Sequence, residues 1–249
     1  MKIKNVLISQ PQPADPEKSP YFELGKKHNL KIDYFKFIKI EGISARDFRK
    51  DKVYIQDHTA IIFTSRNAVD HFFRVAEEMR VEIPDTMKYF CVSESIAFYL
   101  QKYVQYRKRK IFHGQQSFLD LMDIIKKHKN ETFLLPCSDI HKATIPNLLS
   151  EQNIKFNKAV LYRTVDSDLS DLDLSKYDLL VFFSPSGVAS LFKNFPDFKQ
   201  EDKMIAAFGP TTTKAVEDAG MTLNITAPTK TAPSMSMAID EYLKKNKNK

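Results

Sequence analysis

The chain has 249 residues, of which 43% are hydrophobic and 28% are charged. This composition is typical of globular proteins and excludes collagen-like, low-complexity and wholly disordered chains. The longest apolar runs are much shorter than the roughly 20 residues of a membrane-spanning helix, and the amino terminus lacks the long apolar segment of a secretory signal. We therefore expect a cytoplasmic protein without a membrane partner. The net charge is +7, but four of the last six residues are lysines, so the remainder is only mildly basic.

Short apolar, β-branched runs alternate with segments of helical periodicity along the chain. This alternation is typical of repeated βα units around a parallel sheet and predicts an α/β fold. The predicted strands are, in chain order, 5–9, 59–64, 88–92, 110–112, 132–135, 178–183, 204–208 and 222–225. Predicted helices lie at 67–79, 118–128, 145–152 and 211–219.

Three stretches of the first half of the chain resemble stretches of the second half in the order of their residues. Each pair shares the order of strand, turn and helix, which indicates an internal duplication. The pairs are IFTSRNAVDHFF (62–73) with VFFSPSGVASLF (181–192), FCVSESIAFYL (90–100) with AAFGPTTTKAV (206–216), and LGKKHNLKIDYFKFI (24–38) with LLSEQNIKFNKAVLY (148–162).

Two extended segments, 31–40 and 155–164, occupy equivalent places in this repeat and alternate polar and apolar residues, as paired strands do. If they pair as a two-stranded linker, the chain between them forms one lobe and the two chain ends form the other. The sequence thus predicts two similar flavodoxin-like lobes with parallel sheets, related by duplication with exchanged segments. Lobe one comprises 1–37 and 165–249, and lobe two comprises 41–155. A cleft between two such lobes is a common place for a ligand.

Candidate binding residues lie at four turns where a predicted strand ends and a helix begins. Ligands of parallel sheets bind at the carboxyl ends of the strands. Hydroxyl groups beside the positive end of a helix dipole favour carboxylate or phosphate groups. An ordinary N-cap also explains each turn alone, but four such turns in two pairs favour an anionic ligand. The candidate substrate-binding residues are Ser65, Arg66, Asn67, Ser93, Ser95, Ser184, Ser186, Gly187, Thr211 and Thr212.

Several common chemistries lack their motifs in this chain. Neither GxGxxG nor GxxxxGK[ST] is present, which excludes the usual phosphate loops of nucleotide enzymes. The GxSxG motif of triad hydrolases is absent as well. Cys91 and Cys137 do not lie in a metal or redox spacing, and the six histidines are scattered along the chain. We expect neither a metal nor a cofactor.

The segments FTSRNAV, FFSPSGV, AAFGPTTTKAVEDAG and ITAPT (225–229), with VLYRT (160–164) between the first two, resemble the uroporphyrinogen-III synthase family. The resemblance covers nearly the whole chain and is strongest from 160 to 234. It implies a two-lobed α/β lyase without a cofactor. The implied reaction of tetrapyrrole (haem) biosynthesis cyclises hydroxymethylbilane to uroporphyrinogen III with loss of water and inversion of ring D. We expect a monomer.

The same resemblance implies roles for particular residues. Tyr162 matches the family's tyrosine and is the candidate acid that protonates the departing hydroxyl. The hydroxyls of the four turns would hold acetate and propionate groups. The chain departs from the family pattern at 8–13, where ISQPQP replaces a strand end with Thr-Arg-Pro. Basic residues that follow the strand at 132–135 in the family correspond here to His141 and Lys142.

Two other classes of function remain open from the residues alone. A noncatalytic two-lobed binding protein for an anionic small molecule would share the four turns without needing Tyr162. A nucleic-acid-binding module would use the basic run 107–110 and the lysine-rich end of the chain. A run of charges is more often a solvated face, so we expect no nucleic-acid partner.

Overall fold

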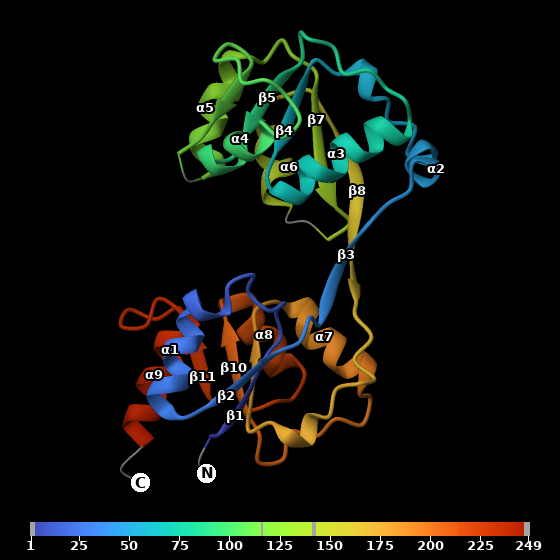
Figure 1. Ribbon diagram of the computed structural model, residues 1–249. Helices are drawn as coiled ribbons and strands as arrows, with labels where there is room; N and C mark the ends of the chain where they lie inside the picture. Colours follow the sequence, from blue (N-terminus) through green and yellow to red (C-terminus); the bar gives the residue numbers. More distant parts are fainter. Residues whose placement is uncertain (1–2, 116, 141–142, 247–249) are drawn as a thin grey trace. The chain divides into compact units, whose positions relative to one another are not determined.

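The structure is a computed structural model that describes residues 3–115, 117–140 and 143–246 (Figure 1). The chain divides into two compact units. Unit 1 consists of residues 1–39 and 165–249, and unit 2 consists of residues 40–164. Each unit has a mainly parallel sheet with helices, so the predicted α/β class is confirmed. His141 and Lys142 lie outside the described residues.

Unit 1 is built on a five-stranded parallel sheet. Its strands are β1 (Asn5–Ile8), β2 (Lys31–Tyr34), β9 (Leu179–Phe182), β10 (Met204–Phe208) and β11 (Ile225–Ala227). Its helices are α1 (Pro20–His28), α7 (Pro185–Asn194), α8 (Pro210–Asp218) and α9 (Met235–Asn246), with short 3-10 helices at Pro16–Lys18 and Leu174–Lys176. The strand order is β11-β10-β9-β1-β2, and all four pairings are parallel. Numbered along the unit, this is the 2-1-3-4-5 order of flavodoxin-like sheets.

Unit 2 carries most of a six-stranded sheet. Its strands are β3 (Ile38–Gly42), β4 (Ala60–Phe63), β5 (Lys88–Cys91), β6 (Ile111–His113), β7 (Phe133–Ser138) and β8 (Phe156–Asp166). Its helices are α2 (Ala45–Phe48), α3 (Arg66–Glu78), α4 (Glu94–Leu100), α5 (Phe118–Lys127) and α6 (Thr144–Glu151), with 3-10 helices at Arg49–Asp51 and Ile55–Asp57. The order is β3-β8-β7-β4-β5-β6. Without β3, and numbered along the unit, this is the order 3-2-1-4-5. It matches the order of unit 1 when β4, β5 and β6 are paired with β9, β10 and β11, and β7 and β8 with β1 and β2. The duplication itself stays a prediction.

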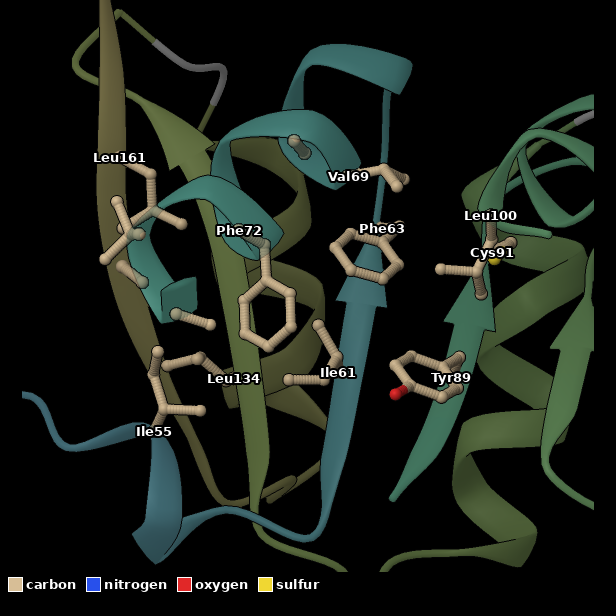
Figure 2. Packing of buried hydrophobic residues seen from close by; sticks show 14 of the residues in the cluster. Ile55, Ile61, Phe63, Val69, Phe72, Tyr89, Cys91, Leu100, Leu134 and Leu161 are labelled. Atoms are coloured by element: carbon tan, nitrogen blue, oxygen red, sulfur yellow. The ribbon is translucent and has the colours of Figure 1, made fainter. Parts of the chain in front are cut away.

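Each sheet is apolar on both faces, because helices cover both of them. In unit 2, Ile61 and Phe63 of β4 pack with α3 and α4, whereas Ala60 and Ile62 pack with α5 on the opposite face. Figure 2 shows the first of these layers, in which the ring of Phe72 lies over the sheet. In unit 1, one face packs α1 and α9 and the other packs α7 and α8. This two-sided burial explains why the strands read as continuous apolar runs.

The structure divides the predicted extended segment 31–40 into two strands. β2 pairs in parallel with β1, and β3 lies next to β8 in the other sheet. Phe37 lies in the chain between the two strands. It is 1% exposed and packs into the core of unit 1. β8 covers the other predicted segment, 155–164, and also pairs with β7 from Phe133 to Ser138. The predicted two-stranded linker therefore accounts for only the contact of β3 with β8, because β2 also pairs with β1 and β8 also pairs with β7.

Two further elements differ from the sequence prediction. The last strand was predicted at 222–225, whereas β11 spans Ile225–Ala227. The side chain of Gln200 accepts a hydrogen bond from the Thr222 amide at 2.7 Å and donates to its carbonyl at 2.9 Å, so this residue pairs outside the sheet. The sequence analysis also did not predict α9, whose mixture of methionine, alanine and polar residues has weak periodicity. Among the described residues, no helix is long and apolar enough to cross a membrane.

Candidate functional site

The candidate turns follow the carboxyl ends of two neighbouring strands in each unit. In unit 2, Ser65 follows β4 and Ser93 follows β5. In unit 1, Ser184 follows β9, and Gly209, two residues before Thr211, follows β10. Within each unit, these strands are paired, so the two turns lie at the same edge of one sheet. This is the edge at which parallel α/β sheets bind their ligands.

Two of the candidate serines are N-caps, as the simpler interpretation of the turns predicted. The Oγ of Ser65 accepts a hydrogen bond from the Ala68 amide at 3.1 Å, and the Oγ of Ser184 accepts one from the Gly187 amide at 3.1 Å. A serine hydroxyl that accepts such a bond still has its own proton to donate. Capping and anion binding are therefore compatible at both serines.

Ser93 has a different arrangement at the start of α4. Its side chain does not cap the helix, and its Oγ lies 3.0 Å from the Oγ of Ser95. The Ser95 side chain is exposed and that of Ser93 is half-buried. This hydroxyl pair can donate to a ligand without breaking a helix cap.

Tyr162 of β8 lies next to the Ser65 turn. Its side chain is buried, with 7% of the residue exposed, and its Oη is 3.2 Å from the Oγ of Ser65. Burial raises the pKa of Tyr162 above its ordinary value, and the hydrogen bond with Ser65 opposes this rise in part. The phenol therefore keeps its proton at neutral pH, within hydrogen-bond reach of a hydroxyl at the carboxyl edge of the sheet.

His71 of α3 stacks on Tyr162. The two ring centroids are 5.0 Å apart and the planes differ by 20°. The Nε of Arg74 donates to the Nδ1 of His71 at 3.2 Å, which leaves the imidazole proton on Nε2. Burial and the Arg74 charge lower the pKa of His71 below its ordinary value. The His71 ring that stacks on Tyr162 is thus neutral at pH 7, with its proton on Nε2.

Arg74 joins α3 to the backbone next to Tyr162. Its Nη2 donates to the carbonyls of Ile43 at 2.8 Å and Leu161 at 3.2 Å, and its Nη1 pairs with Glu78. The guanidinium passes close to Gly42, where an added Cβ would lie 2.7 Å from the guanidinium carbon. The sequence analysis missed both His71 and Arg74. Their spacing of three residues on the helix after a candidate turn is the signal that could have indicated them.

The unit 1 turns place their candidates differently. Gly187 is buried, and a Cβ added there would lie 3.5 Å from the Oγ of Ser184 and 3.8 Å from the Oγ of Ser9. Ser9, which directly follows β1 and which the sequence analysis did not single out, therefore lies beside this turn. Thr212 is only 1% exposed, whereas Thr211 is exposed, so Thr211 presents the accessible hydroxyl. Ser186, which lies between Ser184 and Gly187 in the sequence, is half-buried.

The described residues contain no group of three or more His, Cys, Asp or Glu side chains that could hold a metal ion. Both cysteines are buried, and burial raises the pKa of Cys91 to about 12 and that of Cys137 to about 11. At neutral pH they are thiols, which are poor nucleophiles. At the described turns, exposed hydroxyls can donate hydrogen bonds to an anion, and Tyr162 can donate a proton.

Fold and site together define a class of protein: two doubly wound α/β units with hydroxyl-bearing turns at the carboxyl ends of their strands and a buried tyrosine beside one turn. The family model described as uroporphyrinogen-III synthase HemD matches residues 25–236. The chain belongs to the uroporphyrinogen-III synthase family, a family of cyclising lyases of haem biosynthesis. The resemblance noted in the sequence is therefore confirmed.

Individual relatives agree with this assignment. The uroporphyrinogen-III synthase of Chlorobaculum parvum is 25% identical, and the match covers 97% of this chain and 100% of the relative. Among solved structures, uroporphyrinogen-III synthetase from Helicobacter pylori has a TM-score of 0.61 at 18% identity, with 98% of this chain and 100% of that chain covered. A mutant uroporphyrinogen III synthase from Thermus thermophilus has a TM-score of 0.56 at 15% identity, with the same coverage. These structural matches show that the fold is shared.

Proposed function

We propose that this protein cyclises hydroxymethylbilane to uroporphyrinogen III with loss of water and inversion of ring D, and that Tyr162 is the general acid. Membership of the family supports the reaction and its substrate. The position of Tyr162, buried and bonded to Ser65, is the observation that carries the proposed mechanism.

The reaction needs a proton for its leaving group. The hydroxymethyl C–O bond breaks, the adjacent pyrrole supplies the electron pair that expels the oxygen, and the oxygen leaves as water once it has gained a proton. Because the pyrrole assists this departure, a weak acid suffices. The Oη proton of Tyr162 goes to the leaving oxygen, and the Ser65 hydroxyl can then donate to the phenolate that forms. The proton released by ring closure restores the phenol.

The remaining candidate residues are proposed to bind the carboxylates of the substrate. Acetate and propionate groups accept hydrogen bonds from hydroxyls and backbone amides, and such charge-assisted bonds are stronger than neutral ones. Ser184 and Thr211 offer hydroxyls in unit 1, and the Ser93–Ser95 pair offers them in unit 2. Asn67, exposed in the first turn of α3, adds an amide donor. These contacts hold the substrate while the acid acts.

The test uses freshly generated hydroxymethylbilane and separates the type I and type III products after oxidation. Spontaneous closure yields type I, so we expect the wild-type protein to give mainly type III. Tyr162→Phe keeps the ring on His71 and removes only the hydroxyl, so kcat should fall by about 10²- to 10⁴-fold. Tyr177→Phe is the matched control, because the Tyr177 hydroxyl bonds Asp33, away from the turns, and should leave kcat unchanged.

The outcomes separate the proposals. An unchanged kcat in Tyr162→Phe would show that another group supplies the proton. Exclusive formation of type I by the wild-type protein would contradict the synthase function and favour a noncatalytic binding protein, an alternative that no observation supports at present. A monomeric state, a cytoplasmic location and the absence of a nucleic-acid partner stay predictions.

A further inference from the structure

Two positively charged side chains lie over the ring of Tyr99 on α4. The guanidinium carbon of Arg66 is 5.2 Å from the ring centroid, and the Nζ of Lys102 is 4.9 Å from it. Neither side chain forms a salt bridge with any described residue, and both are exposed. One aromatic side chain thus holds two cations, because the face of its ring carries a negative electrostatic potential.

Contacts with α3 fix the position of the Tyr99 ring. Its hydroxyl donates to both carboxylate oxygens of Asp70, at 2.9 and 2.8 Å, and the Tyr103 hydroxyl donates to the same carboxylate at 2.6 Å. The Tyr103 ring stacks on Phe73 with centroids 4.5 Å apart. Asp70 and Phe73 belong to α3, so these contacts fix the Tyr99 ring between the two helices. The ring then attracts cations to its surface.

Lys102 is fixed by two further contacts. Its Nζ donates to the Tyr99 hydroxyl at 3.3 Å and lies 5.6 Å from the centroid of the Tyr103 ring. The cluster contains two cations and one carboxylate, that of Asp70, and the two phenol groups already donate hydrogen bonds to both oxygens of that carboxylate. A net positive charge therefore remains around the exposed ends of Arg66 and Lys102. It is arranged before any ligand arrives, so binding an anion requires little ordering of side chains.

The cluster adjoins the proposed acid. Arg66 is the first residue of α3 and directly follows Ser65, whose hydroxyl bonds Tyr162. A guanidinium provides a planar pair of N–H donors that matches a carboxylate, and an ammonium adds a point charge. The positive end of α3 has the same sign. A carboxylate bound by Arg66 would therefore lie next to the turn whose serine bonds the proposed acid.

We propose that Arg66 and Lys102, held by Tyr99 and Asp70, form a subsite for one acetate or propionate group of the substrate. This inference rests on the proposed function and adds Lys102 as a binding residue and Tyr99 as a positioning residue. The subsite anchors the bilane next to the Ser65 turn and acts on substrate binding, whereas proton transfer is assigned to Tyr162.

The first test measures KM and kcat for Arg66→Met and Lys102→Met. Each variant should raise KM by about two- to fivefold, the range expected for an exposed ion pair. We expect kcat to stay within twofold of the wild-type value. The double variant should raise KM by less than the product of the single effects, because both side chains bind the same carboxylate. Lys127→Met, which removes an exposed lysine at the end of α5, is the control and should leave KM unchanged.

Tyr99 variants test the positioning role. Tyr99→Phe keeps the ring but loses the bonds to Asp70 and Lys102, whereas Tyr99→Leu also loses the aromatic face. We expect Tyr99→Leu to raise KM as much as the double cation variant does, and Tyr99→Phe to raise it less. Circular dichroism melts identify any variant that is unfolded. A folded Tyr99→Leu with the wild-type KM would overturn the positioning role.

A binding measurement separates the subsite from the reaction. Uroporphyrin III, the oxidised product, keeps all carboxylates and can be titrated into each variant without turnover. We expect Lys102→Met and Arg66→Met to bind it more weakly and with a smaller dependence on salt than wild type. Equal affinity in wild type and both variants would overturn the subsite, even if the wild-type protein makes type III product. Weaker binding in a protein that yields only type I would support the subsite and contradict the synthase function.

Discussion

Arg74 shows how one side chain can control the geometry of a proposed acid without touching the substrate. It bonds His71, which stacks on Tyr162, and it bonds the carbonyl of Leu161, the residue before Tyr162. A lysine in this position offers a single ammonium in place of a planar fork and cannot reproduce these bonds. With lysine in place of Arg74, both the His71 ring that stacks on Tyr162 and the backbone next to Tyr162 would lose a hydrogen bond that fixes their position.

We therefore expect Arg74→Lys to lower kcat by about tenfold or more, since small displacements of a catalytic group are costly. KM should change little, because Arg74 does not contact the carboxylate-binding turns. Steady-state kinetics with hydroxymethylbilane measure both constants. Arg46→Lys, at an exposed arginine of α2, is the control. A rise in KM at constant kcat would show instead that Arg74 acts in substrate binding.

At the scale of elements, α1 and α9 are joined by one carboxylate. Asp240 of α9 accepts from the Nε2 of His28 at 2.6 Å and from Lys27 at 2.9 Å, and it pairs with Lys244 at 2.8 Å. The side chain of His28 is 3% exposed. These donors lower the pKa of Asp240 far below its ordinary value, despite the opposing effect of burial.

A carboxyl whose pKa is lower in the folded state stabilises the fold above its unfolded pKa, which is about 3.9. We expect Asp240→Asn to reduce the free energy of unfolding by about 1–2 kcal/mol at pH 7. The difference in the free energy of unfolding between the variant and the wild type should become smaller as the pH falls below about 4. At such a pH, Asp240 binds a proton in the unfolded state but not in the folded state. Urea unfolding at a series of pH values from 7 to below 4 measures this free energy for both proteins. Asp202→Asn, at an exposed aspartate, should show no such difference at any pH, and an equal loss in both variants would contradict this account.

At the scale of the whole molecule, the two units differ in how the chain builds them. Unit 2 is one continuous segment, 40–164, whereas unit 1 combines both ends of the chain. Unit 2 has apolar clusters on both faces of its sheet, with α3 and α4 on one side and α5 on the other. A continuous segment with its own two-layered core meets the requirements for independent folding.

We predict that a protein consisting of residues 40–164 folds alone. Thermal and urea unfolding should show one cooperative transition, and heteronuclear NMR spectra should be dispersed. Phe63→Asp in the same segment is the control, because it places a charge in a fully buried position and should abolish folding. A segment that is soluble but lacks a cooperative transition would show that unit 2 depends on unit 1.

The sequence by itself determined much of the fold and part of the site. The βα alternation located seven of the eight predicted strands within a few residues, and the resemblance identified the family and Tyr162 as its candidate acid. The turn residues Ser65 and Ser184 were recognisable because capping depends on neighbours in the chain, which a sequence displays directly.

Only the tertiary structure decided which distant residues meet. His71 reaches Tyr162 because β4, β7 and β8 lie side by side, and this strand order places α3 over β8. Arg66 and Lys102 are far apart in the chain and share one ring because β5 adjoins β4 and brings α4 against α3. Periodicity reports the burial of each element, but contacts between elements depend on strand order and register, which local residues do not encode.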